Sequence, residues 1–184
     1  MPEASALPLF FALAAPDEVR ALADRLQDEV RRTIGPARFP ALEGLHLTLA
    51  YLGRMDPVQV PALLAMAGAA ARQGGGFPLR TAGTGGFPRP GRARILWLDF
   101  DPQPALGALA ERLRAALRAG RVGFDDKPFL PHLTLARFRE PVDLGRVVLA
   151  APEPCTFTVR ELGLFQSVPG PEGTRYQLLG SVPL

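Results

Sequence analysis

Residues 46–50 read HLTLA, and residues 132–136 read HLTLA again. The histidines that begin these two segments, His46 and His132, are the only two in the chain of 184 residues. With this composition, the chance that a given histidine is followed by Leu-Thr-Leu is on the order of one in a thousand. The repeat therefore indicates a duplicated structural unit and marks both histidines as candidate functional residues.

Alternation of polar and apolar residues in each segment is typical of a half-buried β-strand. On a strand, successive side chains point to opposite faces, so His46 and Thr48 share one face while the two leucines point into a core. The same pattern places His132 and Thr134 together. If both strands face one cleft, two imidazoles and two hydroxyl groups become available to a single anion.

This set of side chains matches what cleavage of a phosphodiester requires. One imidazole can remove a proton from the attacking oxygen while the other donates a proton to the leaving oxygen, because histidine titrates near neutral pH. The hydroxyl groups of Thr48 and Thr134 can donate hydrogen bonds to the non-bridging phosphate oxygens. The sequence thus favours acid–base phosphoester chemistry.

A metal centre and a serine or cysteine nucleophile are the alternatives. Catalytic zinc usually has three protein ligands, and the chain contains no His-Glu-x-x-His motif; Glu43 is the carboxylate nearest to His46 in sequence. Cys155 and Ser167 lie outside any motif such as Gly-x-Ser-x-Gly. We therefore predict a metal-free site.

The remaining sequence predicts an α+β fold with antiparallel sheets. Hydrophobic periodicity, with Gly and Pro at the boundaries, predicts three helices, near 17–34, 58–72 and 106–117, and a weak fourth helix at 143–150. Strands are expected at 8–14, 45–52, 77–83, 94–100, 132–138, 155–166 and 175–182. The stretch from Thr84 to Arg92, rich in Gly and Pro, is expected to be a loop, and residues 169–173 a turn.

Length and composition indicate one globular domain spanning residues 1–184. The single cysteine, Cys155, excludes an internal disulfide and fits a reducing, cytoplasmic location. The apolar run from Ala6 to Ala15 is preceded by Glu3 and by no basic residue, so we interpret it as a buried strand and not as a secretion signal. The net charge of +3 suits an anionic ligand, and no membrane association is expected.

Taken together, the motifs resemble the two-histidine phosphoesterase superfamily, and within it the RNA 2′,3′-cyclic phosphodiesterases formerly called 2′-5′ RNA ligases. The resemblance extends over nearly the whole chain. Besides the two histidine motifs it includes the following segments: Pro16-Asp17-Glu18-Val19, Tyr51-Leu52-Gly53, Gly86-Phe87-Pro88, Ile95-Leu96-Trp97, Leu164-Phe165-Gln166-Ser167 and Tyr176.

The resemblance implies two pseudo-symmetric lobes of antiparallel strands with outer helices and a central groove. It also implies that His46 protonates the leaving 3′ oxygen, that His132 activates water to leave a 2′-phosphate, and that Thr48 and Thr134 hold the phosphate. Such proteins can also join or cleave 2′-5′ linked RNA, and the resemblance implies that they need no nucleotide cofactor to do so. The expected partners are RNA ends with a 2′,3′-cyclic phosphate or small cyclic nucleotides, and the protein is expected to be a monomer.

Tyr51 and Arg137 each lie five residues after a histidine. In the resembling family an aromatic residue, usually phenylalanine, and an arginine at these positions clasp the nucleobase, as an aromatic ring and a guanidinium plane can do. The odd spacing places both on the face opposite the histidines unless a bend or bulge intervenes.

Three alternatives stay open. The protein could be a nucleotide-binding or RNA-binding module without turnover, or an enzyme whose main task is RNA joining. Arg89, Arg92 and Arg94 could follow an RNA backbone, although a solvated loop is the simpler interpretation. Phe129 is expected to pack in the core.

Overall fold

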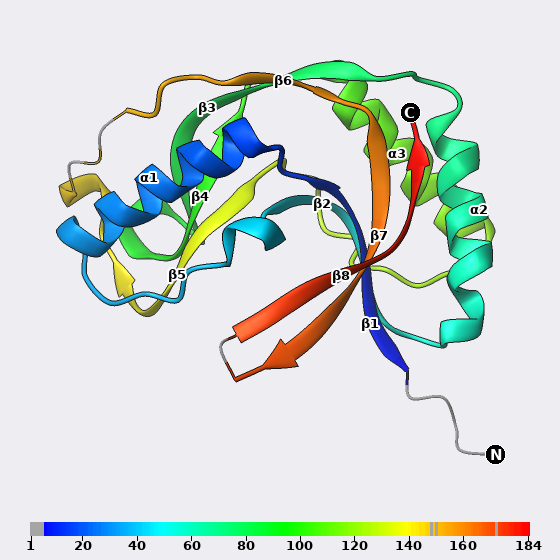
Figure 1. Ribbon diagram of the computed structural model, residues 1–184, viewed down its shortest axis with the longest axis horizontal. Coiled ribbons are helices and arrows are strands. Elements are labelled where there is room, and N and C mark those ends of the chain that lie inside the picture. Colours follow the sequence, from blue (N-terminus) through cyan, green and yellow to red (C-terminus); the bar gives the residue numbers. More distant parts are fainter. Residues whose placement is uncertain (1–5, 148, 150, 172) are drawn as a thin grey trace.

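Eight antiparallel strands form one curled sheet in the computed structural model, which describes residues 6–147, 149, 151–171 and 173–184 (Figure 1). In spatial order the strands are β6 (Thr156–Val159), β3 (Phe77–Phe87), β4 (Ala93–Phe100), β5 (Leu133–Val142), β2 (His46–Met55), β1 (Leu7–Ala14), β7 (Glu161–Gly170) and β8 (Gly173–Pro183). The sheet consists of two four-stranded halves that meet at β5 and β2.

The two halves touch through a single pair of backbone partners, Leu47 on β2 and Leu133 on β5. These leucines occupy the same place in the two HLTLA segments. An antiparallel pair has a local two-fold axis between the partner residues, so the axis that relates the two histidine strands passes through this pair. The predicted α+β architecture of two related lobes is confirmed.

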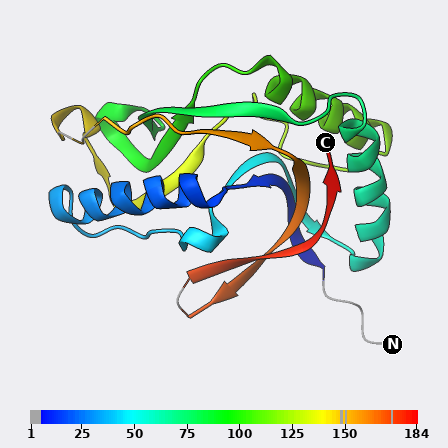
Figure 2. The same cartoon turned by 45° about the horizontal axis from the view of Figure 1, so that its top comes forward.

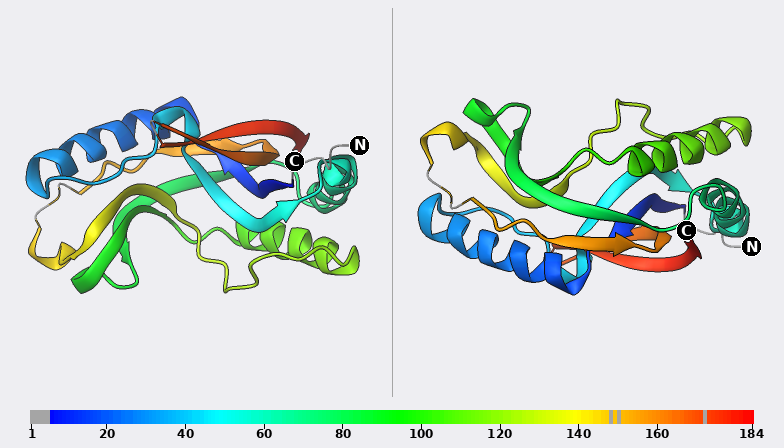
Figure 3. Two further views of the ribbon diagram at one scale, coloured as in Figure 1. Left: turned by 90° about the horizontal axis from the view of Figure 1, so that it is seen from below. Right: turned by 90° about the horizontal axis from the view of Figure 1, so that it is seen from above.

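Three α-helices cover the sheet: α1 (Asp17–Thr33), α2 (Val60–Ala71) and α3 (Pro104–Ala119). Helix α1 begins with two acidic residues and ends with Arg31 and Arg32, which complements the helix dipole. It packs against β5, whereas α3 packs against β2 and α2 lies beside α3. Figures 2 and 3 show α1 at one end of the molecule and α2 with α3 at the other.

Three sequence-based boundaries were wrong. Strand β3 continues to Phe87 through the expected loop. Gly85, which suggested a loop, lies opposite Trp97 in the sheet, where any larger side chain would collide with the indole ring. The expected helix at 143–150 is only a 3₁₀ turn, Leu144–Arg146, and residues 148 and 150 lie outside the described residues. The strand expected at 155–166 is two strands, because the chain crosses from one half-sheet to the other at Arg160.

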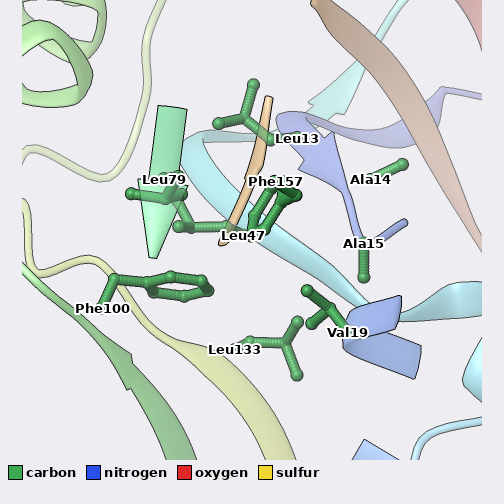
Figure 4. A pocket seen from close by; sticks show the side chains of 9 residues that line it. All are labelled: Leu13, Ala14, Ala15, Val19, Leu47, Leu79, Phe100, Leu133 and Phe157. Carbon is green, nitrogen blue, oxygen red and sulfur yellow. The ribbon is translucent and has the colours of Figure 1, made fainter. Parts of the chain in front are cut away.

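The joint between the halves is apolar on the side away from the histidines. Leu47 and Leu133 are buried there over a cavity of about 10 Å³, shown in Figure 4. Both half-sheets and α1 contribute to its lining, which is formed by Leu13, Ala14, Ala15, Val19, Leu47, Leu79, Phe100, Leu133 and Phe157. The two lobes are therefore held together by side-chain packing more than by strand pairing.

Replacing Leu133 with alanine is expected to lower the free energy of unfolding by about 2–5 kcal/mol, because it enlarges this cavity at a site that is 1% exposed. Urea unfolding followed by circular dichroism measures the change. The control is Leu178→Ala, at a site that is 50% exposed, for which a change within about 0.5 kcal/mol is expected. Equal effects in the two variants would contradict the role given to the joint.

Candidate active site

The side chains of His46, Thr48, His132 and Thr134 lie on one face of the sheet at the joint between its halves. All four are partly exposed, and the leucines between them are buried. With Leu47 paired to Leu133, the antiparallel register sets His46 across from Thr134 and Thr48 across from His132. Each imidazole therefore has a hydroxyl group on its own strand and another across the joint, as the sequence predicts for a shared phosphate site.

Both imidazoles are held in the same way. The Nδ1 atom of His46 lies 2.6 Å from the carbonyl oxygen of Gly44, and the Nδ1 atom of His132 lies 2.8 Å from the carbonyl oxygen of Leu130. A carbonyl oxygen only accepts hydrogen bonds, so Nδ1 carries the proton in each neutral ring. The Nε2 atom of each ring is thereby left to accept or donate a proton toward a ligand.

Aromatic side chains surround each histidine. The ring of His46 lies 4.7 Å from Phe10 and 4.6 Å from Tyr176, measured between centroids. The ring of His132 lies 4.9 Å from Phe87 and 6.2 Å from Trp97. Packing against these rings limits the orientations that each imidazole can adopt.

The environment lowers the pKa of His46 from the ordinary value of 6.5. Burial among the aromatic rings is the main cause, and the hydrogen bond from the ring to Gly44 opposes it. The positive charges of His132 and Arg137 lower the pKa of His46 further. Its surroundings therefore favour the neutral form of His46, and it lies close enough to His132 for the two rings to interact.

A titration by proton NMR checks this interaction, because the chain has only two imidazoles to resolve. We expect the His46 resonance to titrate with a midpoint below pH 6.5. In the His132→Ala variant the midpoint should move upward, because one of the charges that oppose protonation is gone. An unchanged His46 midpoint in that variant would mean that the two rings do not share a site.

Tyr51 and Arg137 lie on the histidine face because each strand contains a β-bulge. In β2, Thr48 and Ala50 are partners of consecutive residues on β1, so Leu49 is an extra residue. In β5, Thr134 and Ala136 are likewise partners of consecutive residues on β4, and Leu135 is extra. The required bulge is therefore present at the same place in both motifs.

Burial of side chains confirms this change of phase. The bulge residue and the alanine after it are both buried in each strand, and the next residue is exposed. Tyr51 is also the direct partner of Phe10, whose ring contacts His46. The structure thus places Tyr51 and Arg137 on the same face as the two histidines and two threonines, one on each half-sheet.

Comparisons with known proteins agree with this geometry. The sequence profile described as the 2′-5′ RNA ligase superfamily matches residues 14–170. The chain belongs to the 2′-5′ RNA ligase superfamily. A curated member from Thermus thermophilus, named RNA 2′,3′-cyclic phosphodiesterase, is 36% identical over 93% of this chain and 87% of its own length.

Solved structures of superfamily proteins share the fold. The crystal structure of TT0787 from Thermus thermophilus has a TM-score of 0.79 at 33% identity, covering 97% of this chain and 98% of that chain. The crystal structure of Escherichia coli LigT complexed with 3′-AMP has a TM-score of 0.80 at 27% identity, with the same coverage of both chains. The superfamily fold therefore extends over nearly the whole chain.

Several residues near the two histidines were given no role at the site from the sequence. Phe10 lies within an apolar run that looks like any core strand. Tyr176 on β8 belongs to the resembling segments, but the sequence does not show that it contacts His46. Arg38 exchanges two backbone hydrogen bonds with Arg137, each 2.8 Å long, so the two side chains project from the same face. No motif marks Arg38, because its place depends on the pairing of a loop with β5.

The arginines around the turn after β3 are exposed or bound to the backbone. Arg89 precedes the 3₁₀ turn Pro90–Arg92, and both Arg89 and Arg92 are exposed. Arg94 on β4 donates a hydrogen bond to the carbonyl oxygen of Arg139. Phe129 packs against the core, as predicted. In the described part of the chain, no three His, Cys, Asp or Glu side chains gather as a metal ion would require. None of the described helices combines the length and apolar character that a membrane crossing requires.

Proposed function

We propose that the protein hydrolyses RNA 2′,3′-cyclic phosphates to 2′-phosphates by metal-independent acid–base catalysis with His46 and His132. One observation carries the proposal: two imidazoles, each with Nδ1 bonded to a carbonyl oxygen and Nε2 left free, lie on one face across a single residue pair. The relatives named RNA 2′,3′-cyclic phosphodiesterase support the substrate class.

In the proposed reaction, His132 acts first as the base. Its Nε2 atom takes a proton from a water molecule whose oxygen attacks phosphorus. The bond between phosphorus and the 3′ oxygen breaks, and His46 donates the proton on its Nε2 atom to that oxygen. The product is a 2′-phosphate with a free 3′-hydroxyl group. Each positioned proton transfer is worth about 10²–10⁴-fold in rate.

The threonines and the two bulged strands supply binding. Thr48 and Thr134 would donate hydrogen bonds to the non-bridging oxygens, where negative charge collects in the transition state. Tyr51 and Arg137 would hold the base by stacking, which discriminates little between bases. This arrangement suits an enzyme that processes the ends of many RNAs.

The lowered pKa of His46 has to be reconciled with its role as proton donor. In the ligand-free protein burial lowers the pKa of this imidazole and favours its neutral form. An anionic phosphate beside the ring stabilises the charged form and raises the pKa. We therefore propose that substrate binding is coupled to uptake of a proton by His46, and that the enzyme resets when His132 loses its proton to solvent.

Product analysis tests the proposal directly. Hydrolysis of 2′,3′-cyclic AMP in the presence of EDTA should give adenosine 2′-phosphate, resolved from the 3′ isomer by phosphorus NMR. A 3′-phosphate product would mean that the substrate binds in the opposite orientation and that His46 and His132 exchange the roles of acid and base. Binding of adenosine 2′-phosphate without any turnover would instead support a non-catalytic binding module.

RNA joining is the second candidate. If the 5′-hydroxyl group of another RNA takes the place of water, the same proton transfers form a 2′-5′ phosphodiester, and no cofactor is needed for atom balance. The superfamily to which the chain belongs favours including this reaction. Incubation of paired tRNA halves, with hydrolysis and joining measured together, separates the two activities.

A further inference from the structure

Two buried polar side chains bind the β-bulges of the histidine strands from behind. Gln27 in the middle of α1 donates a hydrogen bond from Nε2 to the carbonyl oxygen of Leu135, the bulge residue of β5, at 3.2 Å. Arg114 in α3 donates from Nε to the carbonyl oxygen of Leu49, the bulge residue of β2, at 3.4 Å. The same backbone irregularity thus has a side-chain donor from a helix in each half of the molecule.

Both donors also bind the segment that leads into the other histidine strand. Gln27 Nε2 lies 3.1 Å from the carbonyl oxygen of Pro40, which precedes His46. Arg114 donates from a terminal nitrogen to the carbonyl oxygen of Lys127, 2.8 Å away, which precedes His132. Each donor therefore connects the bulge of one histidine motif to the approach segment of the other.

The burial of these donors indicates a specific role. Gln27 is 2% exposed and Arg114 is 7% exposed, and Thr81 is the only other buried polar or charged side chain among the described residues. Taking an amide or a guanidinium group out of water is unfavourable unless it forms hydrogen bonds. An apolar side chain would fill either position at lower cost if packing were all that was needed.

The bulges set which face of the sheet the next residues occupy. A strand without the extra residue would turn Tyr51 and Arg137 to the face opposite the histidines, because side chains alternate with a period of two. We propose that Gln27 and Arg114 are positioning residues that hold the bulges and thereby direct Arg137 and Tyr51, respectively, onto the nucleobase. This inference rests on the proposed function and extends it to the base contacts.

The test compares two substrates that differ only in the base: 2′,3′-cyclic AMP and ribose 2′,3′-cyclic phosphate. Gln27→Met keeps the volume of the side chain and removes its donor. We expect this variant to lower the ratio of kcat/KM for the first substrate over the second by about tenfold, as loss of a base-stacking contact would. Arg114→Lys, a milder change, should lower the ratio in the same direction.

Thr81→Val is the matched control. Thr81 is fully buried, and its hydroxyl group bonds to the backbone of Cys155 on the far side of β4 from the histidine strands. This variant also loses hydrogen bonds of a buried side chain, the two between Thr81 and Cys155, but the substrate ratio should stay at the wild-type value. Equal losses on both substrates in the Gln27 and Arg114 variants would overturn the proposal and leave the two residues a structural role.

A double mutant shows whether Gln27 acts through Arg137. In an Arg137→Met background the guanidinium contact is already absent, so adding Gln27→Met should change the substrate ratio no further. If the two substitutions each lower the substrate ratio by the same factor whether or not the other is present, Gln27 does not act through Arg137, which would contradict the positioning role.

If the wild-type protein turns over neither substrate, the proposed function fails. The affinities of adenosine 2′-phosphate and ribose 2-phosphate, measured by calorimetry, then give the same ratio test for the positioning residues.

Discussion

Replacing either histidine with alanine is expected to lower kcat for 2′,3′-cyclic AMP by about 10²–10⁴-fold, because each imidazole is assigned one proton transfer. The two variants should differ when the leaving group needs no proton. 3′-Deoxyadenosine 2′-(4-nitrophenyl phosphate) presents such a leaving group in place of the 3′ oxygen and has no neighbouring hydroxyl group that could attack instead of water. On this substrate the His46→Ala variant should recover most of its activity, whereas the His132→Ala variant, which lacks the base, should stay impaired.

Both variants should still bind adenosine 2′-phosphate, which shows that the fold and the phosphate contacts survive. Undiminished hydrolysis of the cyclic nucleotide by the His132→Ala variant would rule out the mechanism. Recovery in the His132 variant and not in the His46 variant would exchange the acid and the base. The comparison is informative because the hydrogen bonds that orient the two rings are nearly the same, so the ligand-free geometry alone leaves their roles equivalent.

Replacing Thr48 or Thr134 with valine is expected to lower kcat by about 10²–10³-fold, the effect of removing one hydrogen-bond donor from developing negative charge. Valine has nearly the shape of threonine, so the packing of the strand should be preserved. The serine variants keep the hydroxyl group and should retain activity within about tenfold of the wild type. Steady-state kinetics on 2′,3′-cyclic AMP measure both series.

A valine variant as active as its serine counterpart would show that the hydroxyl group does not contact the phosphate in the transition state. A higher KM with an unchanged kcat would show that the hydroxyl group contributes equally to binding of the substrate and of the transition state. The positions of the threonines across the joint, each opposite the other strand's histidine, lead us to expect similar losses for the two variants.

Much of the site could be predicted from local pattern. The two repeated segments have the alternation of a strand, and their buried leucines and half-exposed histidines follow from it. That the segments lie side by side could not be derived from the residues, because strand pairing depends on contacts between parts of the chain 86 positions apart. The resemblance implied that the two histidine strands face one groove, and in the structure the strands meet at the single pair Leu47 and Leu133.

The bulges show a different limit. Tyr51 and Arg137 follow their histidines by five residues, so they can share the histidine face only if each strand contains a bulge. The Leu-Ala pair where each bulge lies looks like ordinary core sequence. The sequence contains a further signal: Gln27 and Arg114 each lie four residues after a buried alanine on an apolar helix face. Polar residues at such places indicate a buried acceptor, although only the structure shows that the acceptors are bulge carbonyls.

The two-fold relation through Leu47 and Leu133 also bears on the regiochemistry of the proposed reaction. Groups related by rotation cannot by themselves tell one ester oxygen of a cyclic phosphate from the other, since turning the ligand about the axis exchanges them. In the proposed reaction, regioselectivity must therefore come from side chains that differ between the two halves. Tyr51 on β2 is matched by Arg137 on β5, and Tyr176 beside His46 is matched by Phe87 beside His132. Substitutions that make these positions identical in the two halves should reduce the preference for one phosphate isomer, while hydrolysis by the two histidines continues.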